Sequence, residues 1–333
     1  MLAVLETLPG LSRLVQEELN IKNVEHRVVY REDSCLYIDV NPHDISKLRS
    51  LQTVNYVEIE LFDVDYVRDT KTLRKLLREK FREVKELIKE NSLVTFRFYE
   101  VSKRIQKIIL REAERVFKCR LVKARGDYVL SARFLFRKIR IFLDIGTFQP
   151  LYRRWYTRYK SRASLNPILA ASLCVLAGSH KIVIDPFAGS YTIPIEYCRM
   201  WRPEKFTCLD ISFQYLSKGL HNLQSVNSGV YSRIEILCCD FFLFTPREKY
   251  ECIVTDPPRG IRLEVSREFY NRMFRKFAEI CTDECIIVMP MFGRYIKFIE
   301  ECARDNGFDV VDKVCTVQGG YRTFLVKFVR LPR

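Results

Sequence analysis

The pattern of apolar and polar positions divides the chain into two regions of different rhythm. Up to about residue 145, helices and strands follow one another in no regular order. Leu73, Leu77 and Phe81 recur at helical spacing within a long amphipathic stretch. The pattern predicts helices at residues 11–19, at 71–90 and from Ser102 onward, and strands near Val28 and at 36–40, 93–99, 128–136 and 138–143.

From about Lys181 the rhythm becomes regular. Apolar strands end at Asp185, Asp210, Cys239 and Asp256, and later strands are predicted at 285–289, 310–317 and 324–329. Helical patterns occur among and after them, at 269–281 and 295–303. This alternation predicts a doubly wound, mainly parallel α/β sheet. In such a sheet the ligand binds beyond the carboxyl ends of the strands, where the acidic residues lie.

Composition narrows the class of protein without identifying it. With 333 residues, 48% of them hydrophobic and 29% charged, the chain can form two or three globular domains. A disordered tail, a fibre and a small disulfide scaffold are excluded, and a membrane protein is not expected. Because the start shows no secretory signal, we expect a cytoplasmic protein whose twelve cysteines are structural thiols. Their spacing predicts no zinc site.

Charge is concentrated in one segment. The net charge is +15, and residues 97–162 hold 19 Lys and Arg against 5 Asp and Glu. Such a concentration predicts a module that binds a polyanion, although a well-solvated basic face remains the alternative. Aromatic residues within the segment, such as Phe98 and Trp155, could stack on unpaired bases. The candidate contacts with the polyanion are Arg97, Lys103, Arg104, Lys107, Arg137, Lys138, Arg153, Arg154, Arg158, Lys160 and Arg162.

Residues 182–193 predict a strand, a tight turn and the start of a helix. Gly189 would let a ligand approach the backbone, and the helix N-terminus would offer amide donors to a carboxylate. Asp210 could accept hydrogen bonds from both ribose hydroxyls of a nucleoside cofactor. Asp240 could accept from an adenine amino group, with Phe241 packing on the ring. Each Asp alone could be a turn or cap residue, but three in order at strand ends indicate a site.

The segment Thr255-Asp-Pro-Pro-Arg-Gly260 follows the fourth strand of this region. Two prolines stiffen it and leave their carbonyls without local amide competition. Asp256 and the Pro257 carbonyl can together accept both hydrogens of an exocyclic amino group. A rigid turn without chemistry is the alternative.

These motifs resemble those of a known class of enzymes. Asp185-Pro-Phe-Ala-Gly-Ser-Tyr-Thr192 resembles DPFCGSGT, and the segment 255–260 resembles the N/D-PPYG motif, of S-adenosylmethionine-dependent amino methyltransferases. The stretch from Leu143 through Arg162-Ala-Ser-Leu-Asn-Pro167 is similar to the junction in THUMP-containing RNA guanine-N2 methyltransferases of archaeal type. Leu8-Pro-Gly-Leu11 is similar to the start of that family's ferredoxin-like domain. The resemblance is weak at the front and strong over residues 143–260.

The resemblance implies a division of the chain. Residues 1–60 would form an α+β ferredoxin-like domain, 61–147 a THUMP RNA-binding domain, and 148–162 a basic linker. Residues 163–333 would form a Rossmann-like methyltransferase domain with a doubly wound seven-stranded sheet. A monomer that binds tRNA is expected.

The resemblance also implies roles for particular residues. The cofactor's methionine part would lie among residues 185–190 and Thr192, with Asp210 on the ribose. The implied cofactor contacts are Ser164, Leu165, Asn166, Asp185, Phe187, Ala188, Gly189, Ser190, Thr192, Asp210, Ile211, Asp240 and Phe241. Asp256, Pro257, Pro258 and Arg259 would form the target-base site.

Two residues depart from the family pattern. Tyr191 replaces a glycine, which would narrow the cofactor pocket, and Arg259 replaces the tyrosine that stacks on the base. A guanidinium plane can also stack on a base.

The implied activity is methyl transfer to a guanosine amino group of tRNA, at position 6 of the acceptor stem. The sequences Ala163-Ser-Leu-Asn-Pro and Arg259-Gly-Ile-Arg-Leu are closer to the position-6 enzymes than to the position-10 enzymes. Four alternatives stay open: the position-10 tRNA enzyme, a ribosomal RNA guanine-N2 methyltransferase, a DNA adenine-N6 methyltransferase and a catalytically inactive RNA-binding relative.

Overall fold

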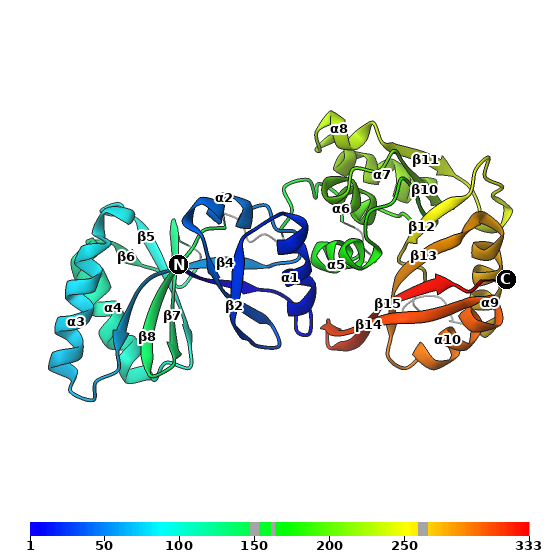
Figure 1. Ribbon diagram of the computed structural model, residues 1–333. Helices are drawn as coiled ribbons and strands as arrows, with labels where there is room; N and C mark the ends of the chain where they lie inside the picture. The colour runs from blue at the N-terminus through cyan, green and yellow to red at the C-terminus, as the bar shows by residue number, and fades with distance from the viewer. Residues whose placement is uncertain (125, 147–152, 161–163, 259–265, 333) are drawn as a thin grey trace.

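The computed structural model describes residues 1–124, 126–146, 153–160, 164–258 and 266–332. An N-terminal module (residues 1–146) and a C-terminal domain (residues 164–332) each contain one sheet, and residues 153–160 form a linker between them. Figure 1 shows the module on the left, from blue at β1 to green at β8, and the domain on the right, from green to red.

The N-terminal module is built on one continuous eight-stranded sheet, in the order β2-β3-β1-β4-β8-β7-β5-β6. Its elements are β1 (Leu2–Glu6), α1 (Ser12–Ile21), β2 (His26–Arg31), β3 (Cys35–Val40), η1 (Pro42–Asp44), α2 (Ile45–Leu48), β4 (Tyr56–Asp65), α3 (Thr70–Glu83), η2 (Lys85–Leu87), β5 (Leu93–Tyr99), α4 (Lys103–Phe117), β6 (Arg120–Leu121), β7 (Tyr128–Leu135) and β8 (Lys138–Asp144). The helices α1 to α4 cover one face, because Ile139 and Ile141 of β8 pack with α3 and α4, while Ile145 packs with α1 and α2.

Strand β4 joins the two halves of this sheet, and the hydrophobic pattern did not predict it. It pairs with β1 on one side and β8 on the other, so the boundary expected after residue 60 falls inside a strand. The strand alternates apolar residues with acidic ones. Glu58 is buried on the face opposite the helices, where the guanidinium of Arg133 donates to it at 2.8 Å.

One predicted helix is shorter than expected. The stretch predicted as a helix over 71–90 forms α3 only as far as Glu83, followed by the 3-10 turn η2. Ile88 after it is extended and buried, which explains why the apolar periodicity outlasts the helix.

The C-terminal domain confirms the predicted doubly wound, mainly parallel sheet. Its order is β11-β10-β9-β12-β13-β15-β14; the first five strands are parallel, and β15 is antiparallel to both neighbours. The elements are α5 (Pro167–Ala177), β9 (Ile182–Asp185), α6 (Thr192–Met200), β10 (Lys205–Asp210), α7 (Phe213–Gln224), α8 (Ser228–Tyr231), β11 (Ile234–Cys238), η3 (Phe241–Leu243), β12 (Tyr250–Val254), α9 (Arg267–Ile280), β13 (Cys281–Phe292), α10 (Ile296–Asp305), β14 (Phe308–Gln318) and β15 (Tyr321–Arg330).

Helices cover both faces of this second sheet. One core contains residues of α5, α6 and α7, and a second core contains residues of α9 and α10. Among the helices of the described chain, none has the length and hydropathy needed to span a bilayer.

The two sheets are held together by direct contacts. Helix α1 lies beside α5 (Figure 1), and Arg13 of α1 forms an ion pair of 2.7 Å with Asp312 of β14. The turn at Gly10 lies against β14, because a Cβ there would be 1.9 Å from the Cys315 carbonyl oxygen. Only glycine fits at this point of close approach.

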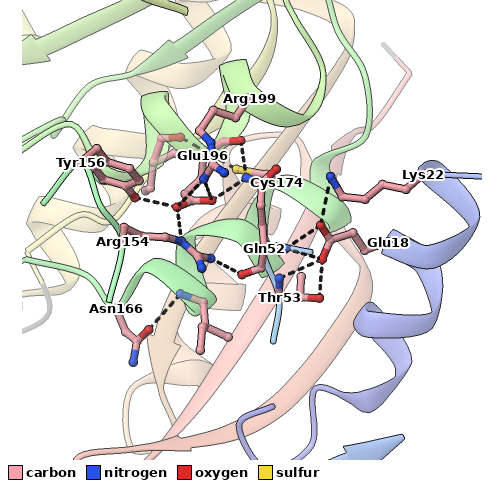
Figure 2. A network of polar contacts seen from close by, with 12 residues as sticks. Glu18, Lys22, Gln52, Thr53, Arg154, Tyr156, Asn166, Cys174, Glu196 and Arg199 are labelled. Carbon is pink, nitrogen blue, oxygen red and sulfur yellow. Dashed lines mark hydrogen bonds and ion pairs between the residues drawn. The ribbon is translucent and has the colours of Figure 1, made fainter. Parts of the chain in front are cut away.

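A buried polar network joins the module, the linker and the C-terminal domain (Figure 2). Glu196 of α6 accepts hydrogen bonds from Arg154 at 2.7 Å, from the Tyr156 hydroxyl at 2.6 Å and from the Gln52 side chain. Although burial raises the pKa of Glu196, Arg154 and Arg199 hold it below its ordinary value. Arg154 also donates to the Gln52 carbonyl.

The network continues into α1. Glu18 is fully buried and accepts from the backbone amides of Gln52 and Thr53 and from the Thr53 hydroxyl, at 2.7–2.9 Å. Lys22 is its cationic neighbour, at 3.6 Å. Every carboxylate in this network therefore has several partners, as buried charges require.

Candidate active site

The loop after β9 forms a cradle at the carboxyl edge of the sheet. The Asp185 carboxylate accepts from the Phe187 amide at 3.1 Å, which closes a tight turn, and the Ala188 amide donates to the Leu209 carbonyl at 2.8 Å. Gly189 has a φ of +50°, and a Cβ there would meet only the Phe187 carbonyl oxygen, at 4.0 Å. The space beside this backbone is therefore open to a ligand.

Asp210 at the end of β10 is oriented by two backbone amides. Gly189 donates to one carboxylate oxygen at 2.9 Å and Ser212 to the other at 2.8 Å. Each oxygen keeps a lone pair for a further donor, such as a ribose hydroxyl. The next side chain, Ile211, is 72% exposed and offers an apolar surface beside that carboxylate.

Asp240 and Phe241, the two residues predicted around an adenine ring, differ in their exposure. Asp240 is half-buried and its carboxylate caps the turn η3 by accepting from the Phe242 amide at 2.9 Å. Phe241 is only 3% exposed and packs edge-on against Phe187 in the core. This burial disfavours the expected role of Phe241 as a platform for a ring, whereas the Ile211 side chain is exposed.

The segment after β12 lies directly beside the cradle. The Thr255 hydroxyl donates to the Asp185 carboxylate at 2.6 Å, and its amide donates to the Val288 carbonyl of β13 at 3.1 Å. The Tyr270 hydroxyl of α9 donates to the Pro258 carbonyl at 3.2 Å. Asp256, Pro257 and Pro258 are thus fixed at both ends, while Arg259 lies outside the described residues.

Burial raises the pKa of Asp185 to about 8, against the hydrogen bonds from Thr255 and Phe187. The nearby negative charges of Asp256 and Asp210 raise it further. Three carboxylates thus gather at the ends of neighbouring strands, and a concentration of this kind is typical of a functional site.

The segment at the start of the C-terminal domain also reaches the cradle. The hydroxyls of Ser164 and Ser190 lie 3.0 Å apart. Leu165 and Asn166 have structural roles instead: Leu165 is buried in the core, and the Asn166 side chain caps α5 by accepting from the Ile168 amide. Their expected cofactor contacts are not supported by these positions.

Tyr191 does not enter the cradle. Its backbone is left-handed, with a φ of +64°, and its side chain is fully buried in the core. A Cβ at Gly219 of α7 would lie 2.8 Å from the Tyr191 ring. The expectation that this tyrosine narrows the ligand pocket is wrong, because Gly219 makes room for the ring behind the loop.

A family model for the RMKL-like methyltransferase domain matches residues 154–322, about half of the chain. The chain belongs to this family. The match covers the linker from Arg154, the cradle, the Asp256–Pro258 segment and most of the β14–β15 hairpin, so the C-terminal domain is a methyltransferase domain.

Two curated relatives are similar to this methyltransferase-domain protein. Both are tRNA (guanine(6)-N2)-methyltransferases, from Methanocaldococcus jannaschii (22% identity over 238 residues) and Archaeoglobus fulgidus (25% identity over 234 residues). The matches cover 59% and 61% of this chain and 62% and 58% of the relatives. The chain thus spans about three-fifths of the length of the curated relatives it matches.

A solved structure shows the same fold over the whole length. TrmN from Thermus thermophilus superposes with a TM-score of 0.78 and 16% identity, covering 99% of each chain. The mixed α/β architecture with a Rossmann-like methyltransferase sheet is therefore shared with TrmN.

Some of the candidate RNA contacts have buried or ion-paired side chains, and others are exposed. Arg154 is buried and bound to Glu196, so its predicted contact with RNA is wrong. Arg97 is mostly buried, with its guanidinium 3.9 Å from the Tyr56 ring, and Lys138 is paired with Asp63. Arg162 lies outside the described residues, and the exposed candidates are Lys103, Arg104, Lys107, Arg137, Arg153, Arg158 and Lys160.

Several residues of the site were not predicted. Thr255 stands within the recognised motif, so its neighbours could have indicated it. Tyr270 and Asn222 have no local signal. Asn222 is buried, accepts from the Arg158 and Tyr159 amides at 2.8 Å and donates to the Ser190 carbonyl at 3.0 Å. It therefore fixes the linker to the cradle. Within the described part of the chain, no group of three His, Cys, Asp or Glu could hold a metal ion.

Proposed function

We propose that this protein is an S-adenosylmethionine-dependent tRNA (guanine-N2)-methyltransferase that acts at position 6 of the acceptor stem. The observation that carries the proposal is the hydrogen bond from Thr255 to Asp185, which joins the cradle to the Asp-Pro-Pro segment. A nucleoside-binding loop and a pair of acceptors for an amino group thereby share one edge of the sheet. The names of the two curated relatives support the substrate.

The cradle fits the cofactor. Open space beside Gly189, the amides at the start of α6 and the Asp210 carboxylate, held by two amides, match a methionine part and a ribose. Ile211 would pack on the adenine, and Asp240 would accept from its amino group. When bound, S-adenosylmethionine supplies an electrophilic methyl group on a sulfonium.

The Asp-Pro-Pro segment would prepare the nucleophile. A guanine amino group is a weak nucleophile because its lone pair is delocalised into the ring. Asp256 and the Pro257 carbonyl would accept its two hydrogens, favour a tetrahedral nitrogen and direct its lone pair into the cradle. Tyr270 holds the segment through the Pro258 carbonyl, so positioning is the main contribution to catalysis.

The base must leave its stack to reach this segment. Arg259 would hold the flipped guanine through its planar face. We expect Arg259→Ala to lower turnover more than Arg259→Tyr, which restores the tyrosine of the family motif.

We propose that the N-terminal module holds the tRNA. Residues 1–60 would form a ferredoxin-like unit and 61–147 a THUMP domain, which share the strand β4. Lys103, Arg104 and Lys107 are exposed in the first turns of α4, and α3, which packs beside α4, adds the exposed Lys71 and Arg74. The fixed contacts of Arg154 and Gly10 would set how far along the stem the active site falls.

The test is methyl transfer to unmodified tRNA transcripts that differ at one nucleotide. We expect a transcript with guanosine 6 replaced by adenosine to lose the methyl acceptor, while replacement of guanosine 10 leaves it intact. The reverse result would contradict position 6. Absence of methylation in the unsubstituted parent transcript would contradict the proposed activity.

A further inference from the structure

The turn between β14 and β15 is an exposed feature that the proposed mechanism does not use. Gln318 pairs with Tyr321, which leaves Gly319 and Gly320 as a two-residue turn with φ values of +56° and +82°. A Cβ on either glycine would meet no described atom within 4 Å. The turn therefore projects freely from the sheet.

The turn stands at the same edge of the sheet as the Asp-Pro-Pro segment. Val254 of β12 lies opposite Val288 of β13, and four residues later Phe292 of β13 lies opposite Thr323 of β15. The four residues from Val288 to Phe292 span about 13 Å of strand. Because β12 and β13 are parallel, the four residues from Val254 to Pro258 run in the same direction. Two strand spacings, about 10 Å, separate β12 from β15 across the sheet.

The side chains at this turn are suited to nucleic acid. Tyr321 is 62% exposed, with its ring 5.6 Å from that of Phe292. Arg294 and Arg322 are exposed close to this turn, because the amide of Gly293 donates to the Arg322 carbonyl at 3.0 Å. Their guanidinium groups lie over the Tyr295 and Phe324 rings, and no ion pair among the described residues includes either of them. An exposed aromatic ring can stack on a base, and nearby cations without acidic partners can bind the adjoining phosphates.

We propose that Tyr321, Arg294 and Arg322 form a second RNA-binding site, which takes a nucleotide next to the target guanosine. Tyr321 stacks on the neighbouring base, and the two guanidinium groups bind the flanking phosphates. The turn points toward the N-terminal module (Figure 1), so an RNA held by the module and entering the active site passes it. The inference rests on the proposed function, because it assumes an RNA substrate.

The experiment compares variants of the full chain with an unmodified tRNA transcript as the probe. Tyr321→Ala removes the ring, Tyr321→Phe keeps it, and the double variant Arg294→Ala with Arg322→Ala removes the cations. The double variant Arg247→Ala with Lys249→Ala is the matched control, because it removes two exposed charges from the opposite edge of the same sheet, before β12. Each protein is measured for S-adenosylmethionine affinity, RNA affinity at several salt concentrations and single-turnover methyl transfer.

We expect Tyr321→Ala to weaken RNA binding and slow methyl transfer by about tenfold, with Tyr321→Phe close to the wild type. In the arginine variant, RNA affinity falls, and the slope of log affinity against log salt concentration decreases by about 1.5. Neither quantity changes in the control variant. Cofactor affinity stays unchanged in all variants. Wild-type activity with unchanged RNA binding in both the Tyr321→Ala and the arginine variants overturns the second site alone. A wild-type protein that binds no tRNA transcript overturns the second site together with the proposed function.

Discussion

Asp185 is a buried carboxyl group with two acidic neighbours, Asp210 and Asp256. Burial, assisted by their charges, raises its pKa from 3.8 to about 8 in the folded protein. Between about pH 4 and pH 8, Asp185 therefore keeps a proton in the folded chain that it has lost in the unfolded chain. Because the folded state binds more protons in this window, this residue lowers stability as the pH rises.

Asp185→Asn removes this proton equilibrium and keeps an oxygen that can accept from Thr255. At each pH, the free energy of unfolding of the wild type is subtracted from that of the variant. We expect this difference to be more favourable to the variant at pH 8 than at pH 5, by at least about 1 kcal/mol. Denaturant unfolding of the cofactor-free proteins at both pH values measures the difference. An equal effect at the two pH values would show that Asp185 is ionised throughout.

Tyr191 and Gly219 form a complementary pair. Gly219→Ala places a Cβ 2.8 Å from the Tyr191 ring, so we expect a loss of about 1–3 kcal/mol in the free energy of unfolding. Gly229→Ala is the control, because its Cβ would meet only the Asn227 side chain at 3.6 Å. The loss should shrink when Tyr191 is also replaced by Ala; additive effects would show that the two residues are not coupled.

The elements of the methyltransferase domain could be predicted well because their signals are local. Asp185 and Asp210 end their strands as expected, and the segment that begins at Thr255 contacts Asp185. Strand β4 was missed because its alternate acidic residues look like surface positions. Their partners are Arg133 for Glu58 and Arg140 for Glu60, which lie on strands far away in the sequence.

The sequence-based predictions failed mainly where a residue contacts a helix or strand that is distant in the sequence. Arg154 belongs to a basic run and looks like an RNA contact in sequence. Its carboxylate partner, Glu196, is 42 residues away on α6, which begins at the cradle. No local pattern reveals that this arginine holds the linker to the methyltransferase domain.

Arg154→Ala leaves Glu196 buried without its main cation, so we expect a loss of about 3–5 kcal/mol in the free energy of unfolding. Arg153→Ala changes the exposed neighbour in the same linker and should cost less than about 1 kcal/mol. Denaturant unfolding of the full chain compares the two. Equal losses would mean that the network does not depend on Arg154.

At the scale of the whole molecule, the basic segment and the active site lie in different parts of one chain. The exposed cations Lys103, Arg104 and Lys107 stand on α4, far along the sequence from the Asp-Pro-Pro segment. The charge pattern located the polycationic segment, but it could not separate exposed cations from those in ion pairs such as Arg97.

Replacing Lys103, Arg104 and Lys107 by Gln should weaken tRNA binding and lower its salt slope by about 2–3, since fewer counterions are released. Replacing Lys181, Arg247 and Lys249 removes the same charge from the amino ends of the methyltransferase strands and should change the slope little. Titrations over a range of salt concentrations measure both. Equal slopes for the two triple variants would mean that the RNA does not contact α4.

We propose that the Asp-Pro-Pro segment orients a guanosine amino group of tRNA to accept the methyl group of S-adenosylmethionine. The most direct measurement is mass analysis of the nucleosides from an unmodified tRNA transcript treated with the protein and S-adenosylmethionine. We expect N2-methylguanosine with the wild type and none with Asp256→Ala, whose affinities for cofactor and RNA stay within about threefold of the wild type. A different methylated nucleoside, or N2-methylguanosine formed at the normal rate by Asp256→Ala, would contradict it.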